Sequence, residues 1–206
     1  MSPKVSKEHQ QQRRTKIVDA AKQVFIENGY ERTTMKHVMD ASKVSRGGLY
    51  QYFANKEELF EAILSESLSK TVEETRGLLN EKVDSYWDLI LLRLFGKSKQ
   101  PNDFMDPLAP SILEFFITSR NDIRRRSYGK ERYELGIKIF SEIIEAGQKN
   151  KEFGSKYESE ILARMIVAFA DGLALDSAIL PIEELKMKEQ SIIFINLLKT
   201  ALELKK

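Results

Sequence analysis

Apolar residues recur at intervals of three and four along nearly the whole chain, and this periodicity limits the fold more than any other feature. In the first clear case the apolar positions are Ile17, Ala20, Ala21, Val24 and Phe25. Such intervals place the side chains on one face of an α-helix, whereas a strand would require strict alternation. No segment alternates convincingly, and there is no internal repeat. The sequence therefore predicts an all-α protein.

Capping residues divide this pattern into helices. Gly29 follows Asn28 and suits the left-handed conformation that ends a helix. Thr33 or Thr34 can cap the second helix by accepting a hydrogen bond from a free amide, as Ser45 can for the third. Helices are therefore expected over 14–28, 34–42, 45–53, 55–80, 85–95, 107–120, 124–150 with an interruption considered at Gly129, 158–180 and 182–204.

Charge is distributed unevenly along the chain. Residues 1–50 contain ten Lys or Arg and five Asp or Glu, whereas residues 51–206 contain 23 and 26. A basic head on a mildly acidic body suggests an anionic partner for the head. We expect a flexible basic arm over 1–13, a basic three-helix head over 14–56 and a larger helical body over 57–206, with the helix from residue 56 joining the two.

Composition excludes several other classes. The chain has no cysteine, which rules out disulfides and thiolate metal sites. No apolar run approaches the roughly 18 residues of a membrane span, and the first dozen residues do not resemble a signal peptide. We therefore expect a soluble, cytoplasmic protein with no membrane partner and no cofactor.

Two short helices separated by a four-residue turn predict a helix-turn-helix in the basic head. The third helix is too short to be stable alone, so Val44, Leu49 and Phe53 must pack on the first two helices. No acidic residue occurs from Ser42 to Asn55. The outer face, which is free to meet a DNA groove, carries Arg46, Gly47, Gly48, Tyr50 and Gln51.

Adjacent glycines at the start of the third helix require an explanation, because each loses about 1 kcal/mol against alanine. A helix that enters the major groove approaches DNA with its first turn, and glycine lets the backbone come close to bases and phosphates. Gly48 in particular could let a thymine methyl or a sugar of the DNA pack close to the backbone. Alternatively, Gly47 and Gly48 belong only to the turn and the helix begins at Leu49, which would leave Ser45 with no helix to cap.

The stretch TTMKHVMDASKVSRGGLYQYFANKEELF, residues 33–60, resembles the DNA-binding signature of the TetR family of bacterial transcription regulators. The resemblance covers roughly residues 14–62. It combines a paired threonine, VS before the recognition helix, LY-x-YF within it and NKEEL after it. The resemblance implies that residues 14–56 form a helix-turn-helix DNA-binding domain and residues 57–206 a ligand-binding and dimerisation domain. It also implies a homodimer, a small-molecule pocket in each body, and repression of a pseudo-palindromic operator that the ligand releases.

The resemblance also implies roles for individual positions. Thr34 and Tyr50 resemble phosphate contacts, and Lys56 resembles a lysine that clamps phosphate. Arg46 is the best candidate for direct reading of guanine, while core packing is the alternative for Tyr50 and Tyr52. The expected DNA-binding residues are Thr34, Lys36, Lys43, Ser45, Arg46, Gly47, Gly48, Tyr50, Tyr52 and Lys56.

Lys43 departs from the family pattern, which usually has glycine in the turn. A side chain in a left-handed turn costs roughly 1 kcal/mol or more. Either the turn differs slightly, or Lys43 is tolerated because it contacts phosphate.

The last two predicted helices are apolar nearly all round, which indicates burial on every side. A four-helix bundle formed with a second copy would cover them, and the alternative is a larger monomeric core. One apolar stripe contains Leu162, Met165, Ile166, Phe169 and Leu173. A second contains Ile161, Ala168, Leu175 and Ala178. The expected dimer contacts are Phe169, Leu173, Phe194 and Leu198.

Aromatic residues and isolated charges in the body suggest a ligand cavity. Glu114 would favour a cationic ligand and Arg93 an anionic one, so the sign of the ligand stays open. The candidate ligand-binding residues are Trp87, Arg93, Glu114, Phe115, Tyr133, Phe169 and Asp171.

Other functional classes fit less well. An enzyme is not expected, because His9 and His37 are the only histidines and no metal-ligand or nucleophile pattern stands out. A helical adaptor that binds protein through residues 49–60 is a second alternative. An activator or a ligand-independent regulator would share the DNA-binding head.

Overall fold

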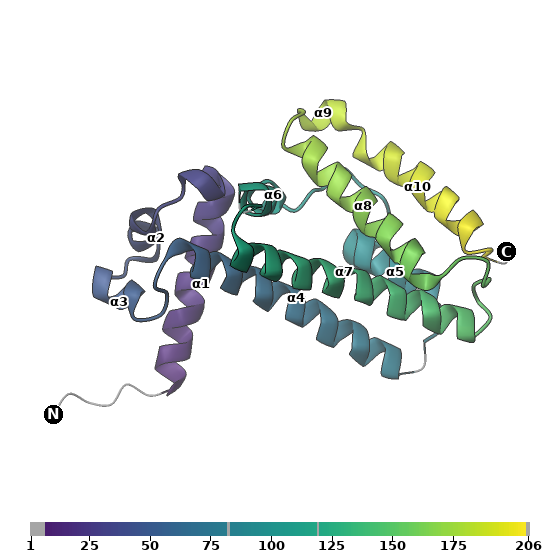
Figure 1. Ribbon diagram of the computed structural model, residues 1–206, viewed down its shortest axis with the longest axis horizontal. Coiled ribbons are helices and arrows are strands. Elements are labelled where there is room, and N and C mark those ends of the chain that lie inside the picture. Colours follow the sequence, from purple (N-terminus) through teal and green to yellow (C-terminus); the bar gives the residue numbers. More distant parts are fainter. Residues whose placement is uncertain (1–6, 82, 119, 205–206) are drawn as a thin grey trace. The chain divides into compact units, whose positions relative to one another are not determined.

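The computed structural model describes residues 7–81, 83–118 and 120–204, and within these ranges it contains helices and no strand (Figure 1). The all-α prediction is confirmed. Among these residues no helix combines the length and the apolarity needed to cross a membrane. The helices are α1 (Lys7–Arg32), α2 (Met35–Ser42), α3 (Arg46–Tyr50), α4 (Lys56–Asn80), α5 (Tyr86–Phe95), the 3-10 helix η1 (Gly96–Ser98), α6 (Ala109–Thr118), α7 (Ile123–Lys149), α8 (Ser159–Ser177), α9 (Ile182–Leu185) and α10 (Met187–Ala201).

The chain folds into two compact units. Unit 1 comprises residues 1–69 and 107–119, and unit 2 comprises residues 70–106 and 120–206. This division differs from the predicted one at residue 56, because the first half of α4 and the whole of α6 belong with the basic head. Helix α6 thus reaches unit 1 from the middle of the sequence, which local periodicity does not reveal.

Aromatic rings form the core of unit 1. Phe25 of α1 and Phe60 of α4 meet edge to face at 4.6 Å between ring centroids. Tyr30 lies 5.0 Å from Phe60, and Phe115 of α6 lies 5.0 Å from Tyr30. Edge-to-face and offset arrangements are the favoured ones for such rings. These contacts hold α1, α4 and α6 together, and α2 packs against α1.

Unit 2 is built on the packing of α7 against α8, with Ile143, Ile144, Leu162 and Ile166 fully buried. Helix α10 lies beside α8 (Figure 1). The rings of Phe169 on α8 and Phe194 on α10 stack with their centroids 4.0 Å apart.

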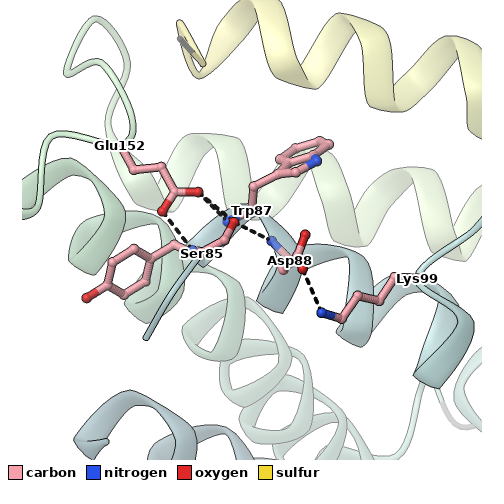
Figure 2. A network of polar contacts seen from close by, with 6 residues as sticks. Ser85, Trp87, Asp88, Lys99 and Glu152 are labelled. Carbon is pink, nitrogen blue, oxygen red and sulfur yellow. Dashed lines mark hydrogen bonds and ion pairs between the residues drawn. The ribbon is translucent and has the colours of Figure 1, made fainter. Parts of the chain in front are cut away.

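A polar network fixes the start of α5 to the turn after α7. The Glu152 carboxylate accepts hydrogen bonds from the Ser85 hydroxyl at 2.9 Å and from the backbone N–H groups of Tyr86 and Trp87 at 2.8 and 2.9 Å (Figure 2). Asp88 in turn accepts from Lys99 at 2.7 Å. A carboxylate at a helix N-terminus satisfies otherwise unpaired amides and complements the helix dipole. Glu152 therefore ties two segments of unit 2 that are distant in sequence.

Three helix predictions need correction. The flexible arm was expected to reach residue 13, but α1 already begins at Lys7, and residues 1–6 lie outside the described residues. Helix α7 continues through Gly129 without a break. The last predicted helix is divided at Lys186, whose φ of 47° separates α9 from α10.

Candidate nucleic-acid interface

Side-chain caps define the helix-turn-helix. The Thr34 hydroxyl accepts from the His37 N–H at 3.3 Å and begins α2, and the Ser45 hydroxyl accepts from the Gly48 N–H at 3.2 Å and begins α3. Before them, α1 bends at Gly29, where φ is 77°. The two hydroxyl caps agree with the sequence predictions, because each depends on a hydroxyl at a fixed local offset. The prediction that Gly29 ends the first helix as a left-handed cap is wrong, because its ψ is 168° and α1 continues to Arg32.

Helix α3 spans five residues and is held in place by its buried side. Leu49 is fully buried, and Phe53, just after the helix, is 2 % exposed. Since one short helix cannot persist alone in water, this packing sets its orientation. Because α3 begins at Arg46, both glycines lie inside the helix, and the alternative of a helix that begins at Leu49 is wrong.

Most of the residues predicted to contact DNA lie on one exposed surface of α2, the turn and α3. We call the exposed members the reading surface. Tyr52 and Lys56 are half-buried beside it, and Gly48 is buried. The reading surface consists of Thr34, Lys36, Lys43, Ser45, Arg46, Gly47 and Tyr50.

The two glycines differ in their surroundings. A Cβ added at Gly47 would meet nothing within 4 Å, so its exposed backbone is open to a partner. A Cβ at Gly48 would lie 2.5 Å from Nη2 of Arg13. A close approach of DNA at either glycine stays a prediction, for which Gly47 has the open space and Gly48 makes room for the Arg13 guanidinium of α1.

Arg13 was predicted to lie in the flexible arm, and this prediction is wrong. Because α1 extends back to Lys7, Arg13 lies on a helix and its side chain reaches the start of α3. The segment KEHQQQRR contains strong helix formers and no breaker, which could have indicated a helix despite the lack of apolar residues. Its basic charge sits directly behind the reading surface.

Lys43 adopts the left-handed conformation, with φ 55° and ψ 40°, at the C-terminal cap of α2. Its backbone N–H donates to the Met39 carbonyl, as a left-handed cap requires. The turn therefore keeps the geometry for which glycine is usually chosen, and the explanation of a different turn is wrong. The exposed Lys43 side chain remains available for a phosphate.

Arg46 and Tyr50 form a pair on the exposed side of α3. The guanidinium carbon of Arg46 lies 5.6 Å from the centroid of the Tyr50 ring, within the range of a cation–π contact. Tyr50 is 42 % exposed, so it is not a core residue. The contact restricts the motion of the exposed Arg46 side chain.

Lys56 has a structural role that the sequence did not suggest. Its ammonium donates to the carbonyls of Tyr30 and Glu31, each at 3.0 Å, and lies 4.5 Å from the Tyr30 ring centroid. Two of its three donors thus satisfy the end of α1. A phosphate contact by Lys56 stays a prediction, and it would have to use the remaining donor.

Comparisons with known proteins follow the same two regions. Residues 17–63 match the family described as "Bacterial regulatory proteins, tetR family", and residues 96–188 match "Tetracyclin repressor-like, C-terminal domain". The "Uncharacterized HTH-type transcriptional regulator YfiR" of Bacillus subtilis (strain 168) is 35% identical over 173 residues, which cover 84% of this chain and 83% of that protein. The chain belongs to the TetR family.

Two further similarities agree with this membership. The "HTH-type transcriptional repressor Rv1474c" of Mycobacterium tuberculosis (strain ATCC 25618 / H37Rv) is 29% identical over 60% of this chain and 71% of that protein. The solved structure of GusR from Salmonella enterica aligns with a TM-score of 0.71 at 22% identity, over 97% of this chain and 98% of that one. The fold of this chain is thus that of the TetR family along nearly its whole length, and the protein is a helix-turn-helix transcriptional regulator.

The candidate ligand residues of this TetR-family chain do not form one group. Glu114 and Phe115 lie on α6 in unit 1, where Phe115 is a core ring and the Glu114 carboxylate accepts from the Glu31 N–H at 3.0 Å. Tyr133 is 40 % exposed on α7. Glu114 and Phe115 therefore lie outside unit 2, because α6 packs on α1, and a ligand contact by either residue stays a prediction.

The remaining candidates belong to unit 2. Trp87 is buried, with the Lys199 ammonium 5.4 Å from its ring centroid. Phe169 stacks on Phe194, and Arg93 is mostly buried. Asp171 lies on an exposed part of α8, where partial burial raises the pKa of its carboxyl. Within the described ranges, no cluster of His, Cys, Asp or Glu is arranged to hold a metal ion.

The predicted dimer contacts differ in burial. Leu173 and Leu198 are only 7 % and 3 % exposed, because they pack inside unit 2 of a single chain. Phe169 and Phe194 stack on each other and are half-buried, so a dimer contact by either residue stays a prediction. The apolar side chains that this TetR-family protein leaves exposed on α8 and α10 are Ile161, Met165, Leu175, Ile192, Ile193 and Leu197.

Proposed function

We propose that this protein acts as a homodimeric repressor that binds a pseudo-palindromic operator and leaves it when a small molecule binds unit 2. The observation that carries the proposal is the reading surface, an exposed basic face with an open backbone at Gly47 on a helix of fixed orientation. Base edges are read by such a face, while Thr34, Lys36 and Lys43 are suited to phosphates.

An apolar stripe on α8 supports the homodimer. Ile161, Met165, Ala168, Gly172 and Leu175 recur at intervals of four and three, so they share one face, and all are exposed. Nothing lies within 4 Å of a Cβ built at Gly172. A contiguous apolar surface of this kind marks a protein interface, and the small residues permit close approach of a second helix.

Exposed residues on α10 extend this surface. Ile193 and Leu197 are 63 % and 64 % exposed, and α10 packs against α8 through the stacked rings of Phe169 and Phe194. Two copies of α8 and α10 would form a four-helix bundle with two-fold symmetry. Two reading surfaces related by that axis would require half-sites about 34–36 Å apart, one turn of DNA.

The test begins with selection of the operator from random duplexes by the full chain. We expect an enriched pseudo-palindrome, bound by a dimer with an affinity that falls steeply with salt. Sedimentation in the absence of DNA gives the oligomeric state independently. Selection of no sequence would contradict specific DNA reading, while tight binding of single half-sites by a monomer would contradict the dimer. A reporter gene under the selected operator separates repression from activation.

A further inference from the structure

Arg93 is the only charged residue in the second half of α5, whose sequence is YWDLILLRLF. Its side chain is only 12 % exposed. A cation that is withdrawn from water needs an opposite charge and hydrogen-bond acceptors to offset the lost hydration. The contacts of Arg93 therefore indicate whether the protein itself supplies that compensation.

The protein supplies little of it. Arg93 Nη1 lies 3.4 Å from Oε2 of Glu74, at the long end of the range for a hydrogen bond. The Nε atom of Arg93 is buried and has no hydrogen-bond partner. Glu74 is itself 50 % exposed, so water screens its charge. One long contact to a half-exposed carboxylate leaves most of the five guanidinium donors of Arg93 without an anionic acceptor.

A second arginine of unit 2 is also partly withdrawn from water. Arg132 of α7 is half-buried, and desolvation lowers its pKa below the usual value, an effect that Tyr128 partly offsets. The half-buried acidic residues in the described part of unit 2 are Asp88, Glu142, Glu152 and Asp176. No hydrogen bond or ion pair joins any of these four carboxylates to Arg93, whose ion pair is with Glu74.

The sequence neighbours of Arg93 on α5 are apolar. Leu92, Leu94 and Phe95 flank it in sequence, and each is only half-buried, although an apolar residue in a complete core would be buried fully. The end of α5 thus combines an under-compensated cation with apolar surface that the chain does not fully cover.

We propose that unit 2 takes an amphipathic anion, an apolar chain that ends in a carboxylate or a similar acid group, with the acid paired to Arg93 in place of Glu74. A carboxylate can accept two parallel hydrogen bonds from a guanidinium, including one from the buried Nε. The cationic alternative loses its support, because Glu114 belongs to unit 1 and is bound to the Glu31 N–H. This inference rests on the proposed function, in which unit 2 holds the effector.

Three probes of matched length test the charge of the ligand: decanoate, decanol and decyltrimethylammonium. Trp87 is the only tryptophan and lies on α5, so its fluorescence in the full-length protein reports binding. We expect decanoate to bind at least tenfold more tightly than decanol, with the ammonium compound weakest. Equal affinities, preference for the ammonium compound, or no binding of any probe would overturn the inference.

Matched variants test the residue. Arg93→Gln is expected to remove the tenfold preference, whereas Arg93→Lys retains part of it. Glu74→Gln is the decisive control, because it breaks the same ion pair from the other side and is expected to tighten decanoate binding by freeing Arg93. If the pair were only structural, Glu74→Gln and Arg93→Gln would lower the melting temperature alike and leave decanoate affinity unchanged, which would contradict the inference.

Operator binding without any probe separates the two proposals. If the protein fails to bind a specific operator, the proposed function is wrong. If it binds the operator normally but shows no preference for decanoate, only the anionic effector is wrong.

Discussion

Helices α3 and α10 both bury one side within their own unit, yet the side chains they leave exposed differ in kind. On α3, Leu49 is buried and the outer face presents Arg46 and Tyr50. On α10, Leu198 is buried and the outer face presents Ile193 and Leu197. The buried sides are similar because both serve folding, so the exposed sides distinguish the partners: a polyanion for α3 and an apolar protein surface for α10.

The largest expected effect comes from placing a charge on the exposed face of α10. Leu197→Glu is expected to dissociate the dimer and to weaken operator binding by at least about 100-fold, because an unpaired charge in an apolar interface costs several kcal/mol. Sedimentation velocity and fluorescence anisotropy measure the two effects.

The neighbouring residue is the control. Leu198→Ala is expected to lower the free energy of unfolding by about 2–5 kcal/mol, because it opens a cavity in the core, while the protein that remains folded stays dimeric. Loss of folding in Leu197→Glu, or loss of dimers only in Leu198→Ala, would reverse the assignment of the two faces.

On the reading surface, Arg46→Ala is expected to cost about 1–3 kcal/mol of operator affinity and to relax selection at one base pair. Its melting temperature should stay close to that of the unchanged protein, because Arg46 is exposed. Anisotropy titrations against the operator and against each single-base variant measure this loss. Lys97→Ala, an exposed lysine of unit 2, is the matched control, and an equal loss there would mean that charge alone and not position matters.

Lys43→Gly should change stability and binding in opposite directions. Removing the side chain from a left-handed position is expected to raise the free energy of unfolding by up to about 1 kcal/mol. If Lys43 contacts phosphate, the slope of log affinity against log salt becomes shallower by about 1. Chemical denaturation and salt titrations on one preparation measure both. An unchanged slope would leave Lys43 without a role at the DNA.

The smallest expected differences separate the two glycines. Gly47→Ala is expected to stabilise α3 by about 0.5–1 kcal/mol and to weaken operator binding, since its open side faces outward. Gly48→Ala must displace the Arg13 guanidinium, so its gain in stability should be smaller and its effect on binding indirect. Thermal melts and isotherms compare the pair. If Gly48→Ala loses more operator affinity than Gly47→Ala, then Gly48 and not Gly47 is the residue that lets DNA approach the backbone.

The sequence determined what depends on neighbours a few residues apart. Thr34 and Ser45 begin helices through hydrogen bonds confined to one turn, as predicted, and Gly29 marks a kink in α1 where the sequence had predicted its end. The order and approximate length of the helices and the exposed basic face of α3 follow from the same local rules. These features were predictable because their energies do not depend on which distant segment packs against them.

Only the tertiary structure decided which of several apolar faces is covered. Helix α8 is apolar on two stripes, and periodicity ranks them equally, whereas packing with Leu185 and Met187 buries Leu173 and leaves Leu175 exposed. Glu114 joins unit 1 through a bond to a residue 83 positions away. The burial of Arg93 and its single long ion pair to Glu74 likewise depend on the tertiary structure and cannot be read from the sequence. A sequence specifies which faces a helix can bury, and the rest of the fold selects among them.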